Sequence, residues 1–268
     1  MWERKRLVDW LWEPYIPFGG ITFIDGDSGV GKSWLCLAIC SIASQGGAFL
    51  GQDGKPTKTL REPYNVLYLC HEHDVVHAVK PRIDVLGAGP GRIFVLQKGT
   101  MITLGDIDII EERIQETGAR LLVFNPLQSF LRNVSGANKA RSLLGLLAEL
   151  AQKYDIAVII TRCLIKHLTS QSIYRATRPT GFTTIASSIL LVGVPPGAKF
   201  NRSERIVAQV ENSFGPKGKS ISFEIKDGQF FWKGLSELEA NDLLKPELGR
   251  RRKRAILAHR RRVLHPQP

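Results

Sequence analysis

The sequence lacks the features that mark membrane and secreted proteins. No apolar run is long enough to span a bilayer, and residues 1–6 are not followed by the apolar core of a signal peptide. No internal repeat is visible. We therefore expect a cytoplasmic protein that has no contact with a membrane.

Cysteine is scarce and shows no paired spacing. The chain has four cysteines and no Cys-x-x-Cys pair, and each lies in an apolar strand-like or helix-like run: Cys36, Cys40, Cys70 and Cys163. We predict that these thiols are reduced and buried.

Acidic residues are outnumbered by basic ones, and the formal net charge is +12. Residues 246–268 hold eight Lys and Arg against one acid, Glu247. Such a segment is expected to be disordered, and it either binds nucleic-acid phosphates without reading sequence or is a solvated tail with no role. We expect one domain over residues 1–245 and a basic tail over 246–268, because 268 residues suffice for one large core.

Residues 26–33 form the most informative motif of the chain. They fit the pattern G-x-x-x-x-G-K-[ST], with a strand-like stretch before them and a helix-like stretch after them. In such a loop the backbone N–H groups and the helix N-terminus surround a phosphate chain, the Lys neutralises it and the Ser binds Mg²⁺. The predicted nucleotide-binding residues are Gly26, Asp27, Ser28, Gly29, Val30, Gly31, Lys32 and Ser33, and the predicted cofactors are ATP and Mg²⁺.

The order of apolar stretches predicts an α/β fold. Continuous apolar stretches at 21–24, 64–70, 92–96, 121–124, 156–160 and 189–192 read as buried parallel strands, with helices at 106–117 and 140–153. Stretches 205–210 and 220–225 alternate, and Asp227-Gly228 is a hairpin turn signal. We expect a mostly parallel sheet with helices on both faces, antiparallel strands at the C-terminal end, and mobile loops over 46–63, 135–139 and 166–184.

Two further residues are expected beside the phosphate loop. Glu72 follows the strand-like stretch 64–70, and a carboxylate there can polarise the water that attacks the γ-phosphorus. Asn125 ends the stretch 121–124, where a P-loop NTPase normally carries an Asp that holds the Mg²⁺ water shell. We predict Glu72 and Lys32 as catalytic residues, and Ser33 and Asn125 as the residues near the metal. Because Asn125 is neutral, we expect weakened hydrolysis.

Several runs in a fixed order carry a family resemblance. They are Trp-Leu-Trp-Glu-Pro-Tyr-Ile-Pro at 10–17, Tyr-Leu-Cys-His-Glu at 68–72, Asn-Pro-Leu-Gln-Ser-Phe-Leu at 125–131, Tyr-Arg at 174–175 and Gly-Pro-Lys-Gly at 215–218. With these runs the chain resembles, over residues 7–244, the RepA-like AAA-family ATPases of plasmids, phages and mobile elements, which belong to the RecA/DnaB group of P-loop NTPases. The resemblance implies a RecA-like core, ATP hydrolysis with Mg²⁺, ring assembly and a role in DNA replication or as a helicase.

The chain also departs from that family at several polar positions. Besides Asn125 in place of Asp, it has Cys-Leu-Ile-Lys at 163–166 where the family has a run of the type His-Leu-Asn-Lys. It has no Asp at 179–182, and residues 211–213 lack the Lys-x-Arg finger of DnaB-type relatives. These losses suggest an ATPase that is decayed or repurposed.

Our first hypothesis is therefore a DNA-associated, RepA-like P-loop ATPase with a replication or helicase role and weakened hydrolysis. Its expected partners are nucleic acid, with single-stranded DNA favoured, and further copies of the chain in a ring, with a hexamer as one form. The main alternative is a non-hydrolysing nucleotide-binding module that assembles or regulates a partner. A third is a P-loop kinase acting on a small molecule, for which the sequence shows no lid or acceptor pocket.

Overall fold

A nine-stranded sheet organises the part of the chain that the computed structural model describes, residues 8–58, 62–70, 75–96, 102–132, 134, 136–164, 183–196 and 203–244. The strands of this sheet are β3 (Gly20–Gly26), β4 (Asn65–Cys70), β5 (Ile93–Leu96), β6 (Ala119–Asn125), β7 (Ala157–Cys163), β8 (Ala186–Gly193), β9 (Glu204–Asn212), β10 (Ser220–Lys226) and β11 (Gln229–Ser236). A short separate hairpin precedes them, formed by β1 (Trp10–Trp12) and β2 (Ile16–Pro17).

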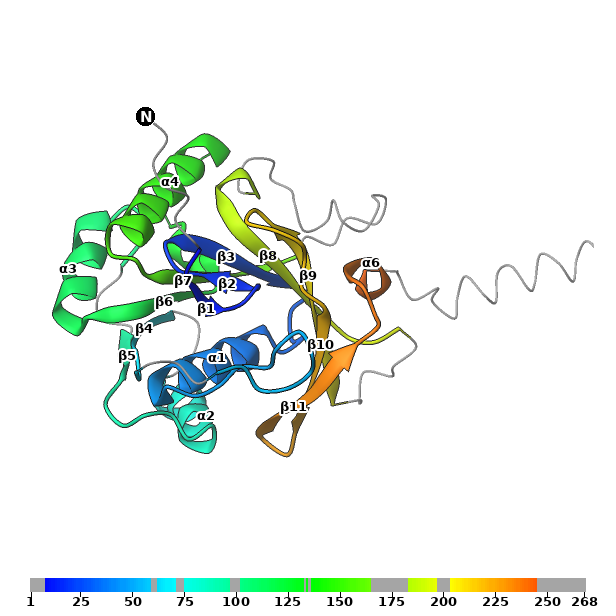
Figure 1. The fold of residues 1–268 in the computed structure, drawn as a ribbon. Helices are drawn as coiled ribbons and strands as arrows, with labels where there is room; N and C mark the ends of the chain where they lie inside the picture. The colour runs from blue at the N-terminus through cyan, green and yellow to red at the C-terminus, as the bar shows by residue number, and fades with distance from the viewer. Residues whose placement is uncertain are drawn as a thin grey trace, which may run out of the picture.

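Helices lie between the strands in the order expected of an α/β protein, and one short helix follows the last strand. They are α1 (Lys32–Gln45), α2 (Lys80–Val85) after a π-helical turn (Val75–Val79), α3 (Ile107–Thr117), α4 (Ala137–Lys153) and α6 (Ala240–Leu243). Short 3-10 turns cover Leu127–Phe130 and Thr183–Ile185. Figure 1 shows how these elements follow one another along the chain.

The strand order confirms the predicted fold class. Across the sheet the order is β11-β10-β9-β8-β3-β7-β6-β4-β5. The strands from β8 to β5 all run parallel, whereas β9, β10 and β11 are antiparallel to their neighbours. Parallel strands need crossover connections, and the helices that supply them cover the sheet.

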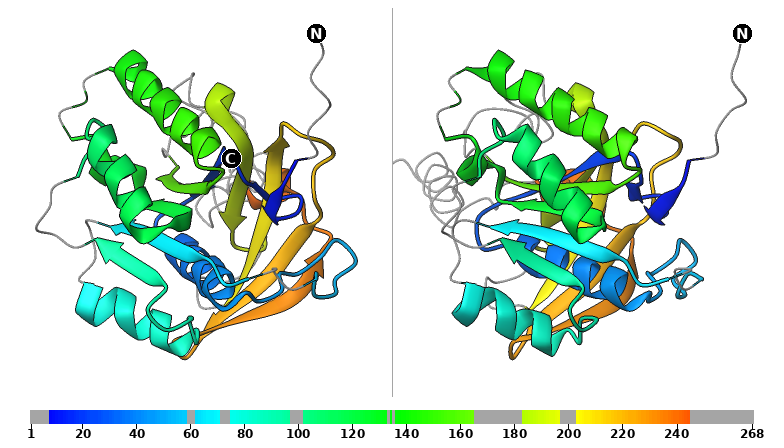
Figure 2. Two further views of the ribbon diagram at one scale, coloured as in Figure 1. Left: turned by 60° about the vertical axis from the view of Figure 1, so that its left-hand side comes forward. Right: turned by 90° about the vertical axis from the view of Figure 1, so that its left-hand side faces the viewer.

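Two apolar cores separate the sheet from its two layers of helices. Helix α1 packs on one face together with residues of the π-helical turn, and α3 and α4 pack on the other. The two turned views in Figure 2 show this three-layer arrangement, with α1 and α2 on one side of the strands and α3 and α4 on the other. Both faces of the central strands are therefore buried, which explains why their sequences are continuously apolar.

The segment after α1 is not the mobile loop that the sequence predicted, at least over residues 46–58. Phe49 is buried and stacks on Trp12, with ring centroids 5.3 Å apart. The Trp12 indole N–H donates to the Leu50 carbonyl at 2.9 Å. Leu50 also forms a bridge with Pro56. The β1–β2 hairpin thus holds this segment against the sheet by aromatic packing, a contact that composition alone does not reveal.

Two further expectations need correction. The amphipathic helix begins at Ala137 rather than residue 140, so most of the predicted loop 135–139 is its first turn. Cys163, at the end of β7, is exposed, whereas Cys36, Cys40 and Cys70 are buried as predicted. Burial raises the pKa of the Cys36 thiol to about 12, which keeps it protonated and unreactive.

Over the described ranges, every helix is too short or too polar to cross a membrane.

Helix α4 offers a matched test of the packing. Leu147 is fully buried between α4 and the sheet, while its neighbour Leu146 is 42% exposed. We expect Leu147→Ala to lower the free energy of unfolding by about 2–5 kcal/mol, because it removes buried methyl groups and leaves a cavity. Leu146→Ala should change it by less than about 0.5 kcal/mol. Urea unfolding of the two variants measures the difference, and equal midpoints would contradict this packing.

Candidate nucleotide-binding site

The phosphate-loop motif lies where β3 passes into α1. Strand β3 is buried over its whole length, and residues 27–29 of the loop are exposed. Helix α1 begins at Lys32 after the N-cap residue Gly31, which supplies no side-chain hydrogen bond to the first turn. The N–H groups of that turn are left for another acceptor, and the helix dipole favours an anion at the same place.

Close backbone packing explains two of the loop glycines. A Cβ on Gly26 would lie 2.6 Å from the Val192 carbonyl oxygen at the end of β8. A Cβ on Gly31 would lie 2.8 Å from the Ile225 side chain of β10, and Gly31 has a φ of 101°, which disfavours other residues. The loop is therefore shaped by β8 and β10 as well as by its own two elements.

Lys32 turns back over the loop that precedes it. Its side chain is buried, and its ammonium donates to the carbonyl oxygens of Gly26, at 2.9 Å, and Asp27, at 2.8 Å. The ammonium thus lies against the backbone at the start of the loop, close to the groups expected to surround phosphates. Its present partners are neutral carbonyls, which a phosphate oxygen would outcompete.

Asn125 is held by three hydroxyl groups beside the start of α1. Its amide nitrogen donates to the Tyr68 hydroxyl at 2.6 Å and to the Ser33 hydroxyl at 3.0 Å. Its amide oxygen accepts a hydrogen bond from the Thr161 hydroxyl at 2.6 Å. Burial raises the pKa of Tyr68 well above its ordinary value, so its hydroxyl stays neutral. The sequence placed Asn125 near Ser33, but it did not identify Tyr68 or Thr161.

Asp25 and Arg162 form a buried ion pair next to the loop. The Arg162 guanidinium donates from Nε and Nη2 to the two carboxylate oxygens of Asp25, each at 2.7 Å. It also lies 3.8 Å from the centre of the Phe23 ring. Burial raises the pKa of Asp25 above its ordinary value, and this effect outweighs the lowering by the charge and hydrogen bonds of Arg162 and by the charge of Lys32. The sequence analysis did not identify this pair. A signal was present, because each partner is a charged residue near the end of an apolar strand.

Arg205 is another residue that the sequence analysis missed. It lies near the start of β9, and its Nε donates to the Val30 carbonyl of the loop at 3.1 Å. Partial burial lowers the pKa of Arg205. The antiparallel strands thus bring a cation to the outer side of the phosphate loop.

Some predicted residues are not placed. Glu72, residues 165–166 of the run at 163–166, residues 179–182 and the basic tail lie outside the described residues. The strand before Glu72 is placed, however, and its last residue, Cys70, pairs with Asn125 in the sheet. Within the described ranges, no cluster of His, Cys, Asp or Glu could hold a metal ion by itself. Among the described residues, the hydroxyl of Ser33 and the amide of Asn125 are the groups placed where a metal would meet the phosphates.

Comparison with known proteins identifies the family. A family model described as AAA domain matches residues 2–166, which is more than half of the chain. The chain belongs to this AAA domain family. No curated protein matches it.

A solved structure supports the fold. The chain is similar to a KaiC-like protein, PH0186, from the hyperthermophilic archaeon Pyrococcus horikoshii OT3, with a TM-score of 0.57 and 14% sequence identity. The match covers 81% of this chain and 90% of the other. With the sheet order, it shows that this AAA domain protein has the RecA-like α/β fold.

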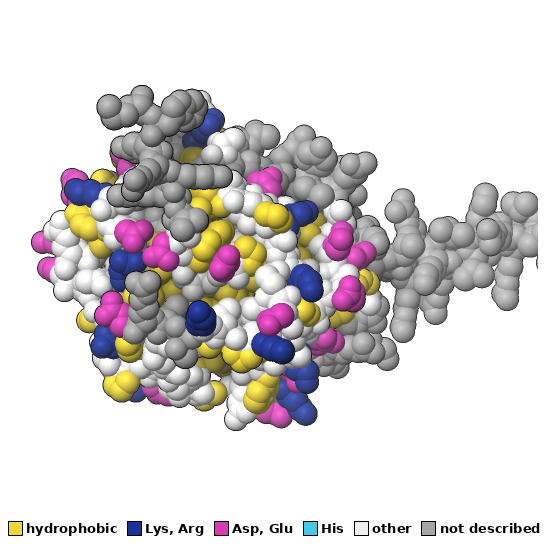
Figure 3. All heavy atoms as spheres, viewed as in Figure 1, with side chains coloured by type: hydrophobic (Ala, Val, Ile, Leu, Met, Phe, Trp, Pro, Cys, Tyr) yellow, Lys and Arg dark blue, Asp and Glu magenta, His cyan; other side chains and the backbone are white. Residues whose placement is uncertain are grey.

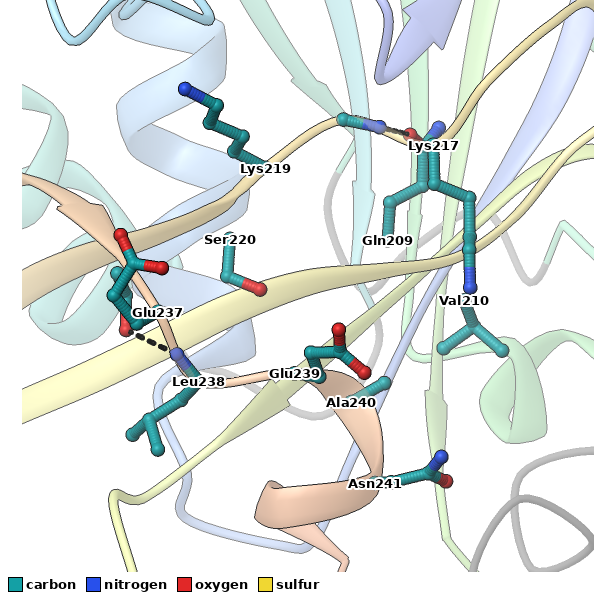
Figure 4. A pocket seen from close by; sticks show the side chains of 12 residues that line it. Gln209, Val210, Lys217, Lys219, Ser220, Glu237, Leu238, Glu239, Ala240 and Asn241 are labelled. Carbon is teal, nitrogen blue, oxygen red and sulfur yellow. Dashed lines mark hydrogen bonds between the residues drawn. The ribbon is translucent and has the colours of Figure 1, made fainter.

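The AAA domain protein also has a cavity of about 450 Å³ beside the turn between β9 and β10 (Figure 4). Polar side chains line it, among them Gln209, Lys217, Lys219, Glu237 and Glu239. Gln209 accepts a hydrogen bond from the Gly218 N–H at 2.6 Å, which closes the Gly-Pro-Lys-Gly turn. This turn follows Ser213, whose N–H donates to the Ser187 carbonyl at the start of β8. The turn therefore lies at the end of the strands opposite the phosphate loop.

Proposed function

We propose that this protein is a P-loop ATPase of the RepA/DnaB type that binds ATP with Mg²⁺ and works on DNA in replication or as a helicase. The observation that carries the proposal is the intact phosphate loop between β3 and α1, with the Lys32 ammonium turned over its mouth. Membership of the AAA domain family and the RecA-like fold support it.

The residues at the loop divide the work of binding. The N–H groups at the start of α1 and of the loop donate hydrogen bonds to the phosphate oxygens, and Lys32 neutralises the β- and γ-phosphates. Ser33 offers its hydroxyl to the metal, and Asn125 holds that hydroxyl in place through the 3.0 Å hydrogen bond. When bound, Mg²⁺ neutralises the charge on the β- and γ-phosphate oxygens.

Position 125 sets the expected rate of hydrolysis. Asn125 is neutral and donates to Ser33, so it brings no negative charge toward the metal. The three hydroxyls around it can each donate as well as accept, so a carboxylate fits the same space. We therefore propose slow hydrolysis in this protein, with Glu72 as the residue that polarises the water.

The proposed DNA contact rests on charge. The net charge of +12 favours an anionic partner. On the face in Figure 3, however, Lys and Arg side chains of the described residues are interspersed with Asp and Glu. That face offers no field of one sign, so we propose that residues 246–268, with their eight cations, supply much of the affinity.

A non-hydrolysing nucleotide-binding module is the second candidate. The neutral amide at Asn125 favours it, as do the departures from the RepA-like pattern at 163–166 and 211–213. We propose a homo-oligomeric ring in either case. An ATP turnover assay with and without single-stranded DNA separates the two functions: an ATPase of this type turns over faster with DNA, and the module shows no turnover in either condition.

Nucleotide binding should depend on Lys32. We expect Lys32→Ala to weaken ATP binding by about a hundredfold, because a buried cation is lost from the phosphate site. Lys80→Ala is the control, since it removes the same charge from an exposed i,i+4 ion pair with Asp84 on α2. Isothermal calorimetry with ATP and Mg²⁺ measures both. Equal affinities for wild type and Lys32→Ala would refute the proposed site.

Restoring the carboxylate should raise turnover. We expect Asn125→Asp to increase the ATPase rate by about tenfold, because the added charge lies beside Ser33 and the metal. Asn138→Asp, on the exposed first turn of α4, adds the same charge elsewhere and should leave the rate unchanged. Rates are measured over a Mg²⁺ titration. A rate for Asn125→Asp no higher than wild type would show that position 125 does not limit hydrolysis.

The tail should supply salt-sensitive DNA affinity. Deleting residues 246–268 should weaken binding of single-stranded DNA at low salt and flatten the plot of log affinity against log salt, since fewer counterions are released. A tail of the same length with its eight cations changed to Gln should behave like the deletion. Filter binding over a salt series measures the slopes, with ATP binding as the control that stays constant. An unchanged slope would assign DNA binding to the rest of the chain.

A further inference from the structure

The ion pair of Asp25 and Arg162 lies directly beneath the phosphate loop. Asp25 precedes Gly26, the first residue of the loop, and is completely buried. Arg162 is its partner in the parallel pairing of β3 with β7. The guanidinium donates one hydrogen bond of 2.7 Å to each carboxylate oxygen, and its face lies over the Phe23 ring. Burying two charges costs free energy that apolar residues of the same size would not require. A role other than stability is therefore expected for this pair.

The pair and the loop lysine approach the loop from opposite faces of the sheet. Phe23, two residues before Asp25, belongs to the core beneath α3 and α4, and side chains two apart in a strand share a face. Lys32 comes from α1 on the other face, and its ammonium is bonded to the carbonyl of Gly26, the residue next to Asp25. The charge of Lys32 acts on the Asp25 carboxylate, although no hydrogen bond joins the two among the described residues.

This arrangement has an electrostatic consequence. A buried carboxylate without a partner would attract the nearest cation and would repel the phosphates of a nucleotide. With Arg162 bound to both oxygens, the pair is neutral overall, and the positive charge of Lys32 remains for the phosphates. The end of β7 is also tied to the loop through its backbone, because the Leu164 N–H donates to the Gly26 carbonyl at 3.2 Å.

We propose that Arg162 is a positioning residue for nucleotide binding: it neutralises Asp25 beneath the phosphate loop and so keeps the Lys32 ammonium available to the phosphates. This inference rests on the proposed nucleotide-binding function and adds to it a residue from β7 that does not touch the nucleotide. Its role is electrostatic, and it depends on the charge of Asp25.

A charge-rescue experiment tests this role. Arg162→Met keeps an apolar stem over Phe23 but removes the charge, and Asp25→Asn removes the opposite charge. We expect Arg162→Met to weaken ADP and ATP binding by about tenfold or more, since a close charge interaction is of that size. The double variant Asp25→Asn/Arg162→Met should bind within about threefold of wild type, because no uncompensated charge remains. Calorimetry gives the affinities, and circular dichroism with thermal melting shows that each variant is folded.

The outcomes separate an electrostatic role from a structural one. A structural role predicts that the double variant binds as weakly as Arg162→Met, and that result would overturn the proposal. Unchanged affinity in a folded Arg162→Met would overturn it as well. If Arg162→Met does not fold, Arg162→Gln replaces it, which also removes the charge but keeps a hydrogen-bond donor for Asp25 and should bind about tenfold more weakly than wild type; wild-type affinity in a folded Arg162→Gln would overturn the proposal. A wild-type protein that binds no nucleotide would instead refute the proposed function and this inference together.

Discussion

The parallel register between β3 and β7 is the constraint on which the candidate site depends. The two strands pair from Gly20 with Ala157 to Gly26 with Cys163, so they end together at the phosphate loop. Successive side chains of β7 point to opposite faces, and the strand therefore serves both halves of the site. Thr161 reaches Asn125 on the face of α1, while Arg162 reaches Asp25 on the face of α4. A slip of one residue would exchange these faces and break both contacts at once.

The sequence predicted the parts of this site that are local in the chain. The phosphate loop and its flanking strand and helix lie within a few tens of residues, and each carries its own periodic or glycine signal. The fold class was predictable for the same reason, since buried parallel strands are recognisable one at a time. Contacts between distant residues were not predictable: Arg162 is 137 positions from Asp25, and nothing local shows that they pair. Cys163 was predicted to be buried because its neighbours are apolar, but it ends the strand and is exposed.

The surroundings of Asn125 explain why two functions remain in competition. A neutral amide and a carboxylate have nearly the same shape, and the three hydroxyls of Tyr68, Thr161 and Ser33 can adapt to either by reversing their hydrogen bonds. The side chain at position 125 therefore has the shape of a carboxylate without its charge. A slow ATPase and a nucleotide-binding module would share this structure down to the hydrogen bonds, and they would differ only in what happens after binding.

The packing of the antiparallel strands on the phosphate loop has a consequence for where the functional unit ends. Ile225 of β10 lies against Gly31, and Arg205 of β9 bonds to the Val30 carbonyl, yet both residues lie beyond residue 166, where the AAA family match stops. The region that the family model matches is thus shorter than the region whose residues pack against the phosphate loop. A fragment that ends at residue 166 would retain every residue of the motif but would lose the strands β9 and β10, which pack against the loop.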